Sequence, residues 1–233
     1  MFDAKDVAVV AVVWSLQGGS GCSVVAALLA LHWSRSSSPG SAVVDLGGDQ
    51  PAVLGCEGGT GPGIADWLAS DRQGDDQLAR LVHTVGPGLG LLSVGTRPWP
   101  EHTDAAGSVR SMFAQLDAQP SRFVVDAGSV IGIGGPRGAF VSEVVRLAPA
   151  SILVVRACYL NLRRIVSMPT VPSKVVLLAE RGRALGVGDV EQALGLPVSL
   201  RLEMDASVSR AVDAGLLLSR PLPRLDRAMR TLT

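Results

Sequence analysis

A glycine-rich segment lies between an apolar run and a helical pattern near the start of the sequence. Residues 17–23 read Gln-Gly-Gly-Ser-Gly-Cys-Ser and are followed by the apolar stretch 24–31. Glycines let the backbone turn tightly and point several N–H groups into one concavity, which the positive end of the following helix also faces. Such a nest suits a phosphate, although a glycine-rich turn before a helix can also be purely structural. We expect six residues to form this phosphate cradle: Gly18, Gly19, Ser20, Gly21, Cys22 and Ser23.

The same segment departs from the P-loop pattern G-x-x-x-x-G-K-[ST] at two positions. Gly21 and Ser23 match the pattern, whereas Leu16 stands at the first glycine and Cys22 at the lysine. That lysine reaches the β- and γ-phosphates, so its loss removes a cation from the site of a highly negative ligand. One lost charge-assisted contact costs about 1.5–3 kcal/mol, or roughly one to two decades in affinity. The sequence therefore predicts weak phosphate binding.

Short β-branched runs alternate with longer helical patterns along the chain. The predicted strands are 7–14, 42–46, 89–94, 122–126, 152–155, 174–178 and 198–200. The predicted helices are 23–34, 64–70, 75–82, 104–118, 140–147, 161–166, 189–194 and 208–217, with a last one near 223–232. Several of the strands are apolar at every position, as a parallel sheet covered on both faces requires. This order predicts an α/β three-layer sandwich, in which helices flank a mostly parallel central sheet.

The composition excludes several classes of protein. The chain of 233 residues carries 21 basic and 21 acidic side chains, and 47% of all residues are hydrophobic. A disordered tail would combine low hydrophobicity with high net charge, and a generic nucleic-acid binder would show a basic excess. The chain has neither property, which argues against specific nucleic-acid recognition. No linker, composition shift or repeat divides the sequence, so we expect residues 1–233 to form one domain.

The cysteines and the apolar runs indicate a cytoplasmic protein. Three widely spaced cysteines form no C-x-x-C pair and do not cluster with the three histidines, which disfavours both a disulfide framework and a zinc site. The first residues include acids and lack a small-residue cleavage site, unlike a signal peptide. The longest apolar runs, 7–14 and 24–31, fall short of the roughly 20 residues that span a bilayer.

The glycine-rich segment resembles the deviant P-loop of the ParA/MinD family of ATPases, which typically reads K-G-G-x-G-K-[ST]. Three further segments follow in the family's order. Segment 43–50 (VVDLGGDQ) is similar to the D-x-D motif, 123–126 (FVVD) to the Walker B strand, and 197–215 to the closing segment. The resemblance covers about residues 7–218, and it points in particular to the pilus- and septum-positioning (TadZ/CpaE-like) branches.

The resemblance implies a P-loop NTPase-like fold and a site for ATP with Mg²⁺. In the family the P-loop holds the phosphates, and the Walker B acid holds magnesium through water. Carried over to this sequence, the implied magnesium ligands are Ser23, Asp45 and Asp126, provided that a nucleotide binds. The resemblance also implies a homodimer and a protein partner in a pilus, division or chromosome-positioning machinery.

The departures from the family's pattern fall on its chemistry. The P-loop lysine corresponds to Cys22, and the signature lysine that reaches across the dimer corresponds to Gln17. The second acid of D-x-D, associated with positioning the attacking water, corresponds to Gly47, and the adenine-reading asparagine falls near Ala179. The chain has only two lysines, so arginine is the available substitute, and Arg156 at the end of its strand is the best placed.

These losses decide between two functions. Phosphoryl transfer depends on positioning and charge neutralisation, so removing both lysines and an acid should cripple turnover. We therefore expect a non-hydrolysing pseudo-ATPase that acts as a dimerising or docking regulator. The alternative is a weak but active ATPase whose nucleotide-driven dimerisation positions a cargo.

Two residues of the site have alternative interpretations. If Gly47 and Gly48 bulge, Asp49 can take the place of the missing acid as a catalytic residue; otherwise Asp49 begins a surface loop with Gln50. Cys22 lies at a helix N-terminus, where the dipole can lower the pKa of a thiol. It is either such an activated thiol or a small residue that fills the space of the absent lysine.

Three other segments suggest contacts outside the pocket. The glycine-rich stretches 55–63 and 128–138 correspond to loops that change with nucleotide state in the family. Arg163 and Arg164 either meet an acidic partner or simply solvate a helix. Residues 221–233 form an amphipathic basic helix with an apolar stripe over 222–232. This stripe either binds the inner face of the membrane peripherally, as in MinD-type proteins, or packs on the domain.

Overall fold

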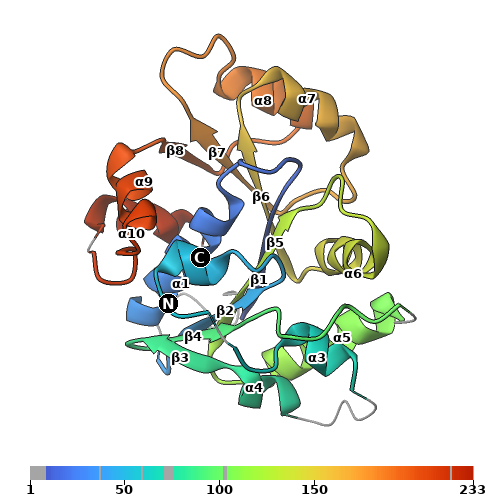
Figure 1. Ribbon diagram of the computed structural model, residues 1–233. Helices are drawn as coiled ribbons and strands as arrows, with labels where there is room; N and C mark the ends of the chain where they lie inside the picture. The colour runs from blue at the N-terminus through green and yellow to red at the C-terminus, as the bar shows by residue number, and fades with distance from the viewer. Residues whose placement is uncertain are drawn as a thin grey trace, which may run out of the picture.

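Eight strands form one sheet in the part of the chain that the structure describes, which comprises residues 9–36, 38–58, 60–70, 76–101, 104–220 and 222–232. The structure is a computed structural model, and its strand order is β3-β4-β2-β5-β1-β6-β7-β8 (Figure 1). The strands are β1 (Val10–Ser15), β2 (Ser41–Asp45), β3 (His83–Gly86), β4 (Leu89–Leu92), β5 (Arg122–Ser129), β6 (Ala150–Arg156), β7 (Lys174–Ala179) and β8 (Leu200–Glu203). Only the β3–β4 pair is antiparallel within this described sheet, which confirms the predicted α/β fold.

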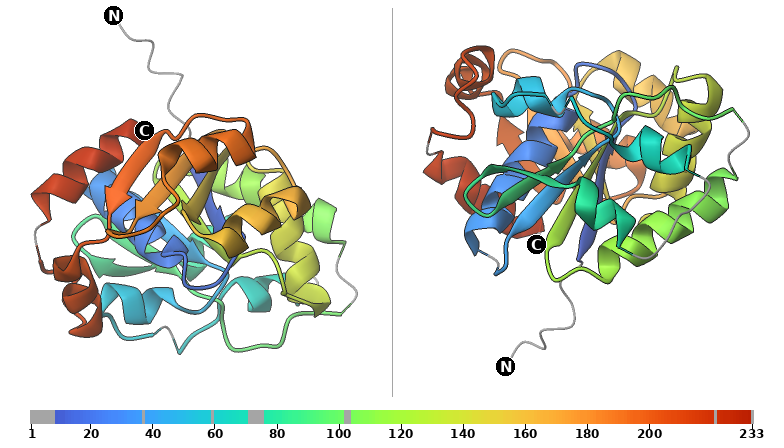
Figure 2. Two further views of the ribbon diagram at one scale, coloured as in Figure 1. Left: turned by 90° about the horizontal axis from the view of Figure 1, so that it is seen from above. Right: turned by 60° about the horizontal axis from the view of Figure 1, so that its bottom comes forward.

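Helices lie on both faces of the twisted sheet, as Figure 2 shows. They are α1 (Cys22–Ser36), α2 (Gln50–Leu54), α3 (Ile64–Leu68), α4 (Gln77–Leu81), α5 (Ala105–Asp117), α6 (Gly135–Arg146), α7 (Tyr159–Arg164), α8 (Val187–Leu194), α9 (Ala206–Asp213) and α10 (Pro223–Met229). Buried side chains of α1, α2, α9 and α10 share one core cluster, and those of α3 to α6 share another on the opposite face. The layers are those of the predicted three-layer sandwich.

The central strands are apolar because both of their faces are covered. Every residue of β1 and β2 is buried, and β5 is buried from Phe123 to Ala127. The parallel register pairs Asp45 at the end of β2 with Asp126 of β5. Because the carboxyl ends of parallel strands meet at one edge of the sheet, the loops after β1, β2 and β5 meet there too.

The elements at the rim of the sheet differ from those that the sequence predicts. The hairpin strand β3 lacks fully buried residues and therefore shows no apolar run. Strand β8 begins two residues later than predicted, because it is an edge strand in which buried Leu202 lies between exposed Arg201 and Glu203. The short helix α2, which carries a proline in its first turn where helices favour this residue, is missing from the predicted elements.

The C-terminal helix α10 packs its apolar stripe on the α1 side of the sheet. Met229 and Leu232 are buried, and the partly buried Leu222 and Leu225 pack against the same core cluster. Of the two interpretations of segment 222–232, packing on the domain is the one that the structure shows. Peripheral membrane contact through this stripe does not fit the arrangement, because these side chains face the core. No helix in the described residues has the length and apolarity needed to cross a membrane.

Candidate functional site

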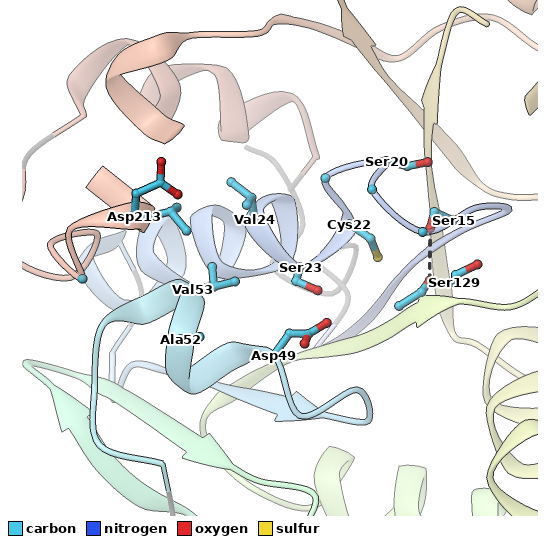
Figure 3. Close-up of a pocket in the computed structure, with 16 residues that line it drawn as sticks. Ser15, Ser20, Cys22, Ser23, Val24, Asp49, Ala52, Val53, Ser129 and Asp213 are labelled. Carbon is cyan, nitrogen blue, oxygen red and sulfur yellow. Dashed lines mark hydrogen bonds between the residues drawn. The ribbon is translucent and has the colours of Figure 1, made fainter. Parts of the chain in front are cut away.

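A pocket of about 670 Å³ opens at the carboxyl edge of the sheet, between the β1–α1 loop, α2 and the end of α9. All six residues predicted to form the phosphate cradle line it. In Figure 3 the side chains of Cys22, Ser23 and Asp49 turn toward the space between the first turn of α1 and the start of α2. The remaining wall consists of Ser15, Val24, Ala52, Val53, Gly128, Ser129, Val212, Asp213 and Gly215.

The cradle is a tight glycine turn that leads into a helix. Gly19 and Gly21 have φ angles of 74° and 79°, in the left-handed region that glycine adopts without strain. Helix α1 begins directly after them at Cys22, so its N-terminal dipole end faces the pocket. The hydroxyl group of Ser20 is buried and has no hydrogen-bond partner among the described residues. This geometry fits a phosphate group held by backbone N–H groups and one hydroxyl.

Close packing between two glycines closes the pocket at the α2 end. Gly55 caps α2 with a φ of 73°, and a side chain at this position would collide with the backbone of Gly215. The N–H group of Leu218 also donates to the carbonyl oxygen of Leu54 at 3.4 Å. The C-terminal part of the chain thereby forms one wall of the pocket.

Asp126 lies at the centre of a buried polar network beneath the cradle. Its Oδ2 accepts a hydrogen bond of 2.7 Å from Nε2 of Gln50, and its Oδ1 accepts from the N–H group of Gly128 at 3.0 Å. The thiol of Cys22 donates to Oδ1 at 3.5 Å, and the side chain of Ser23 lies near enough to this carboxylate to lower its pKa. Burial raises the pKa of Asp126 above its ordinary value in spite of these donors.

Asp45 is the second buried acid of the network. Its Oδ1 accepts from the N–H groups of Gly47 and Gly48 at 2.9 and 2.7 Å, and its Oδ2 accepts from that of Gln50 at 3.0 Å. Burial and the neighbouring Asp126 raise the pKa of Asp45 from 3.8 to about 6. The structure therefore brings Asp45, Asp126 and Ser23 together, as the family resemblance implies for a magnesium site.

The donor set of this network fits a magnesium ion. Mg²⁺ prefers carboxylate, hydroxyl and carbonyl oxygens, and Asp45, Asp126 and Ser23 supply the first two kinds. The Oε1 atom of Gln50 is buried without a hydrogen-bond partner among the described residues, so an amide oxygen is available to a metal-bound water. A divalent cation would also relieve the repulsion between the two carboxylates. The described residues contain no cluster of three or more His, Cys, Asp or Glu, so phosphate and water oxygens would have to complete the coordination.

The pocket lacks the cation that a triphosphate needs. The described residues that line it include the carboxylates of Asp49 and Asp213 but no lysine or arginine. Arg156, the substitute expected from the sequence, donates to the carbonyl oxygen of Gly19 at 3.3 Å and pairs with Glu180. Its charge is therefore compensated outside the cradle, and Glu180 also pairs with Arg183.

Cys22 is a buried thiol and not an activated one. Its side chain turns inward from the lysine position of the P-loop pattern and contacts Asp126. Burial and the negative charge of Asp126 raise the pKa of Cys22 well above its usual range. The interpretation as a dipole-activated nucleophile is therefore wrong, and Cys22 fills space beneath the cradle.

Asp49 is an exposed residue at the start of a short helix. It is the N-cap residue of α2, and Gln50, which follows it, is completely buried. Asp49 lines the pocket, and its Oδ2 atom lies 3.7 Å from the position that a Cβ on Gly47 would take. The surface-loop interpretation fits the exposed Asp49 but not Gln50, which is buried in the first turn of α2. A catalytic role for Asp49 stays a prediction.

Two residues of the site escaped the sequence analysis. Gln50 joins Asp126 to the carbonyl oxygen of Ser23, to which its Nε2 donates at 2.9 Å. Arg137, in the first turn of α6, donates from Nε to the carbonyl oxygen of Leu46 at 2.8 Å. The proline after Gln50 was a signal for a helix start, whereas nothing near Arg137 in the sequence indicated its contact with β2.

An apolar cavity of about 240 Å³ adjoins the cradle on the α9 side and shares Gly21 and Val24 with the pocket. Leu178, at the end of β7, packs directly on Gly21. The described lining includes no asparagine or glutamine side chain, in agreement with alanine at position 179. The cavity can hold an apolar ring face but has no amide to read a base edge.

The predicted switch stretches and the predicted contact of Arg163 and Arg164 can also be located in the structure. Gly128 and Ser129, from the predicted switch stretch 128–138, line it directly. In the other stretch, 55–63, residue 59 lies outside the described residues. Arg164 donates to the carbonyl oxygen of Leu16 at 3.3 Å, while Arg163 is exposed and lies over the ring of Tyr159. That these segments switch or bind a partner stays a prediction.

We expect the contribution of Asp45 to the free energy of unfolding to fall as the pH rises from about 4 to about 6. Folded Asp45 keeps its proton to about pH 6, whereas the unfolded chain releases it near 3.8, so raising the pH favours the unfolded state in this window. The full effect corresponds to about 3 kcal/mol. Urea denaturation at pH 4.5 and 7.5 should show Asp45→Asn gaining about 2 kcal/mol relative to wild type between these pH values. If the difference in the free energy of unfolding between Asp45→Asn and wild type is the same at both pH values, this prediction is contradicted.

The fold has clear counterparts among solved structures. No protein-family model and no curated protein matches the sequence. A ParA family ATPase from Chlorobium tepidum is 20% identical, with a TM-score of 0.72, over 96% of this chain and 97% of that one. MinD in its complex with MinC from Aquifex aeolicus is 17% identical, with a TM-score of 0.73 and coverage of 96% and 94%. The septum site-determining protein MinD with Mg-ADP from Pyrococcus horikoshii is 16% identical, with a TM-score of 0.70, over 96% of this chain and 94% of that one. This protein therefore has the P-loop fold of the ParA/MinD ATPases.

Proposed function

We propose that this protein is a ParA/MinD-like pseudo-ATPase: it binds a magnesium nucleotide weakly, does not hydrolyse it, and acts as a dimerising or docking regulator of cellular positioning. The observation that carries the proposal is the pocket wall. The glycine cradle lines this pocket and the buried Asp45 and Asp126 lie beneath it, but the described lining residues carry two further carboxylates, those of Asp49 and Asp213, and no lysine or arginine.

The charge of this pocket opposes catalysis more than binding. Backbone N–H groups and a magnesium ion can hold a phosphate chain, although the affinity is lower because the lysine is absent. Turnover additionally requires that charge developing in the transition state be neutralised, and the described residues that line the pocket include no lysine or arginine to do so. The thiol of Cys22 lies on Asp126 instead of reaching toward the phosphates.

The regulatory part of the proposal rests on the fold and on the chemistry that is missing. Among solved structures this fold occurs in a ParA family ATPase, in a septum site-determining protein MinD, and in a MinD in complex with MinC. A chain that keeps this scaffold and loses the turnover machinery is suited to act through contacts, as a homodimer or on a component of a pilus, division or chromosome machinery.

One observation favours a weak ATPase as the second candidate. The carboxylate of Asp49 lies 3.7 Å from the position that a side chain on Gly47 would occupy, where the family's second acid would begin. Asp49 also faces the pocket, so it is placed to orient a water molecule if a phosphate chain is bound.

Calorimetric titration with Mg-ATP, together with a phosphate-release assay, separates the two functions. We expect weak binding and no phosphate release above the level of the Asp126→Ala variant. Micromolar binding with turnover that Asp126→Ala abolishes would overturn the pseudo-ATPase proposal. In that case Asp49→Asn, which removes the relocated acid but keeps its size, would identify Asp49 as the water-orienting residue by a loss of turnover without a loss of binding.

A further inference from the structure

The empty position beside Gly47 is approached by three side chains, two carboxylates and one guanidinium. A Cβ atom built on Gly47 would lie 3.6 Å from Oδ1 of Asp45, 3.7 Å from Oδ2 of Asp49 and 3.7 Å from Nη2 of Arg137. Asp49 lines the phosphate pocket, so the guanidinium of Arg137 comes within one side-chain length of the pocket wall. Arg137 and Asp49 form no ion pair with each other in the described structure.

Arg137 is held by one nitrogen and leaves its other two uncommitted. Its Nε donates to the carbonyl oxygen of Leu46, which fixes the plane of the guanidinium against the end of β2. No hydrogen bond or ion pair engages Nη1 or Nη2 among the described residues. A guanidinium fork anchored in this way matches the geometry of a phosphate group.

The other arginines near the cradle are already engaged. Arg156 pairs with Glu180 and donates to Gly19, and Arg164 donates to the carbonyl oxygen of Leu16. The guanidinium groups of both arginines thus donate to backbone carbonyl oxygens of the loop. Of these three arginines, Arg137 is the one for which the described structure shows no partner on either terminal nitrogen.

We infer that Arg137 supplies the missing positive charge of this pocket and binds the terminal phosphate of a magnesium nucleotide. The counter-charge comes from α6, after the strand that carries Asp126, and not from the glycine loop. This inference rests on the proposed function, since it requires that the pocket binds a nucleotide, but it does not require that the nucleotide stays intact.

The position of Arg137 also predicts which segment responds to the ligand. The stretch 128–134 connects the pocket residues Gly128 and Ser129 to the first turn of α6. Contact between Arg137 and a terminal phosphate would restrain both ends of this stretch. Hydrogen exchange over residues 128–138 should then slow when Mg-ATP is added and should slow less with Mg-AMP, which lacks the terminal phosphates.

The test is calorimetric titration of the full chain with Mg-ATP and Mg-AMP. We expect Arg137→Ala to weaken ATP binding by about 10- to 100-fold and AMP binding by much less. Arg137→Lys, which keeps the charge but loses the fork, should retain part of the affinity. Arg146→Ala is the matched control, because Arg146 lies in the last turn of the same helix, is exposed, and pairs with Glu143 at 2.6 Å.

The outcomes separate this inference from the proposed function. Equal affinity of wild type and Arg137→Ala for Mg-ATP, or an equal loss for ATP and AMP, would overturn the role of Arg137. The absence of any nucleotide binding by the wild type would overturn it as well. Hydrolysis by the wild type, combined with selective loss of ATP binding in Arg137→Ala, would overturn the pseudo-ATPase proposal and support the role of Arg137. Loss of the exchange protection over 128–138 in Arg137→Ala would support it independently of affinity.

Discussion

Replacing Cys22 by lysine is expected to strengthen Mg-ATP binding by about 10- to 100-fold, because it restores one charge-assisted contact worth about 1.5–3 kcal/mol. The backbone needed for that contact is already present. The turn at Gly19 and Gly21 and the start of α1 have the geometry of a phosphate cradle. A lysine ammonium would also lie near Asp126, whose Oδ1 is 3.5 Å from the thiol, and would neutralise this buried acid when no ligand is bound.

The control for this gain is Cys22→Met, which adds length without charge. Calorimetric titration of wild type and both variants measures the effect, and circular dichroism shows whether each remains folded. If Cys22→Lys is folded and binds no better than Cys22→Met, the pocket cannot accept a phosphate chain, and a nucleotide-binding function becomes untenable. A gain in affinity without a gain in turnover would place the remaining defect at position 47, where the second acid is absent.

The central fold could be predicted because its signals are local, and the two buried acids were implied by the resemblance to the ParA/MinD motifs. Strands covered on both faces appear as apolar runs, and Asp45 and Asp126 each stand at the end of such a run. Parallel strands then bring both carboxylates to one edge of the sheet, which the register of β2 and β5 confirms. The glycine turn was equally visible, since its residue types and the following helix are contiguous in the sequence.

The partners that surround these acids could not be predicted, because they come from distant parts of the chain. Gln50 bonds to Asp126 across 76 residues, and Arg137 bonds to Leu46 across 91. An amide or an arginine in a loop carries no periodicity that indicates its partner. The edge strands β3 and β8 were weak signals for a related reason: half of their surface faces solvent, so hydrophobicity alternates or is absent.

The inward turn of Cys22 decides between the two interpretations that the sequence leaves open for this residue. The position at a helix N-terminus favours a thiolate only if the thiol faces solvent or a cation. Here the side chain lies beneath the loop against Asp126, where burial and a like charge both oppose ionisation. The prediction that Cys22 lies at a helix N-terminus is confirmed, but the direction of its side chain determines its chemistry.

Replacing Asp126 by asparagine is expected to stabilise the protein by about 1–3 kcal/mol at pH 7.5 in the absence of metal and nucleotide. Burial raises the pKa of Asp126, which means that the fold opposes its charge, and ionised Asp45 on the neighbouring strand adds repulsion. Asparagine keeps the size and one acceptor oxygen. The amide of Gln50 can rotate to offer its partnerless Oε1 to the new NH₂ group, at the expense of its bond to Ser23.

Asp66→Asn is the control of opposite sign. Although burial opposes ionisation of Asp66, the N–H groups of Gly63 and Thr96 lower its pKa below the ordinary value, so its charge supports the fold. We expect urea denaturation at pH 7.5 to show Asp66→Asn less stable than wild type and Asp126→Asn more stable. Added Mg-ATP should then stabilise the wild type but not Asp126→Asn. A loss of more than about 1 kcal/mol in Asp126→Asn would instead show that Asp126 holds the fold together. The acid pair would then be a structural feature and not a ligand site kept at the expense of stability.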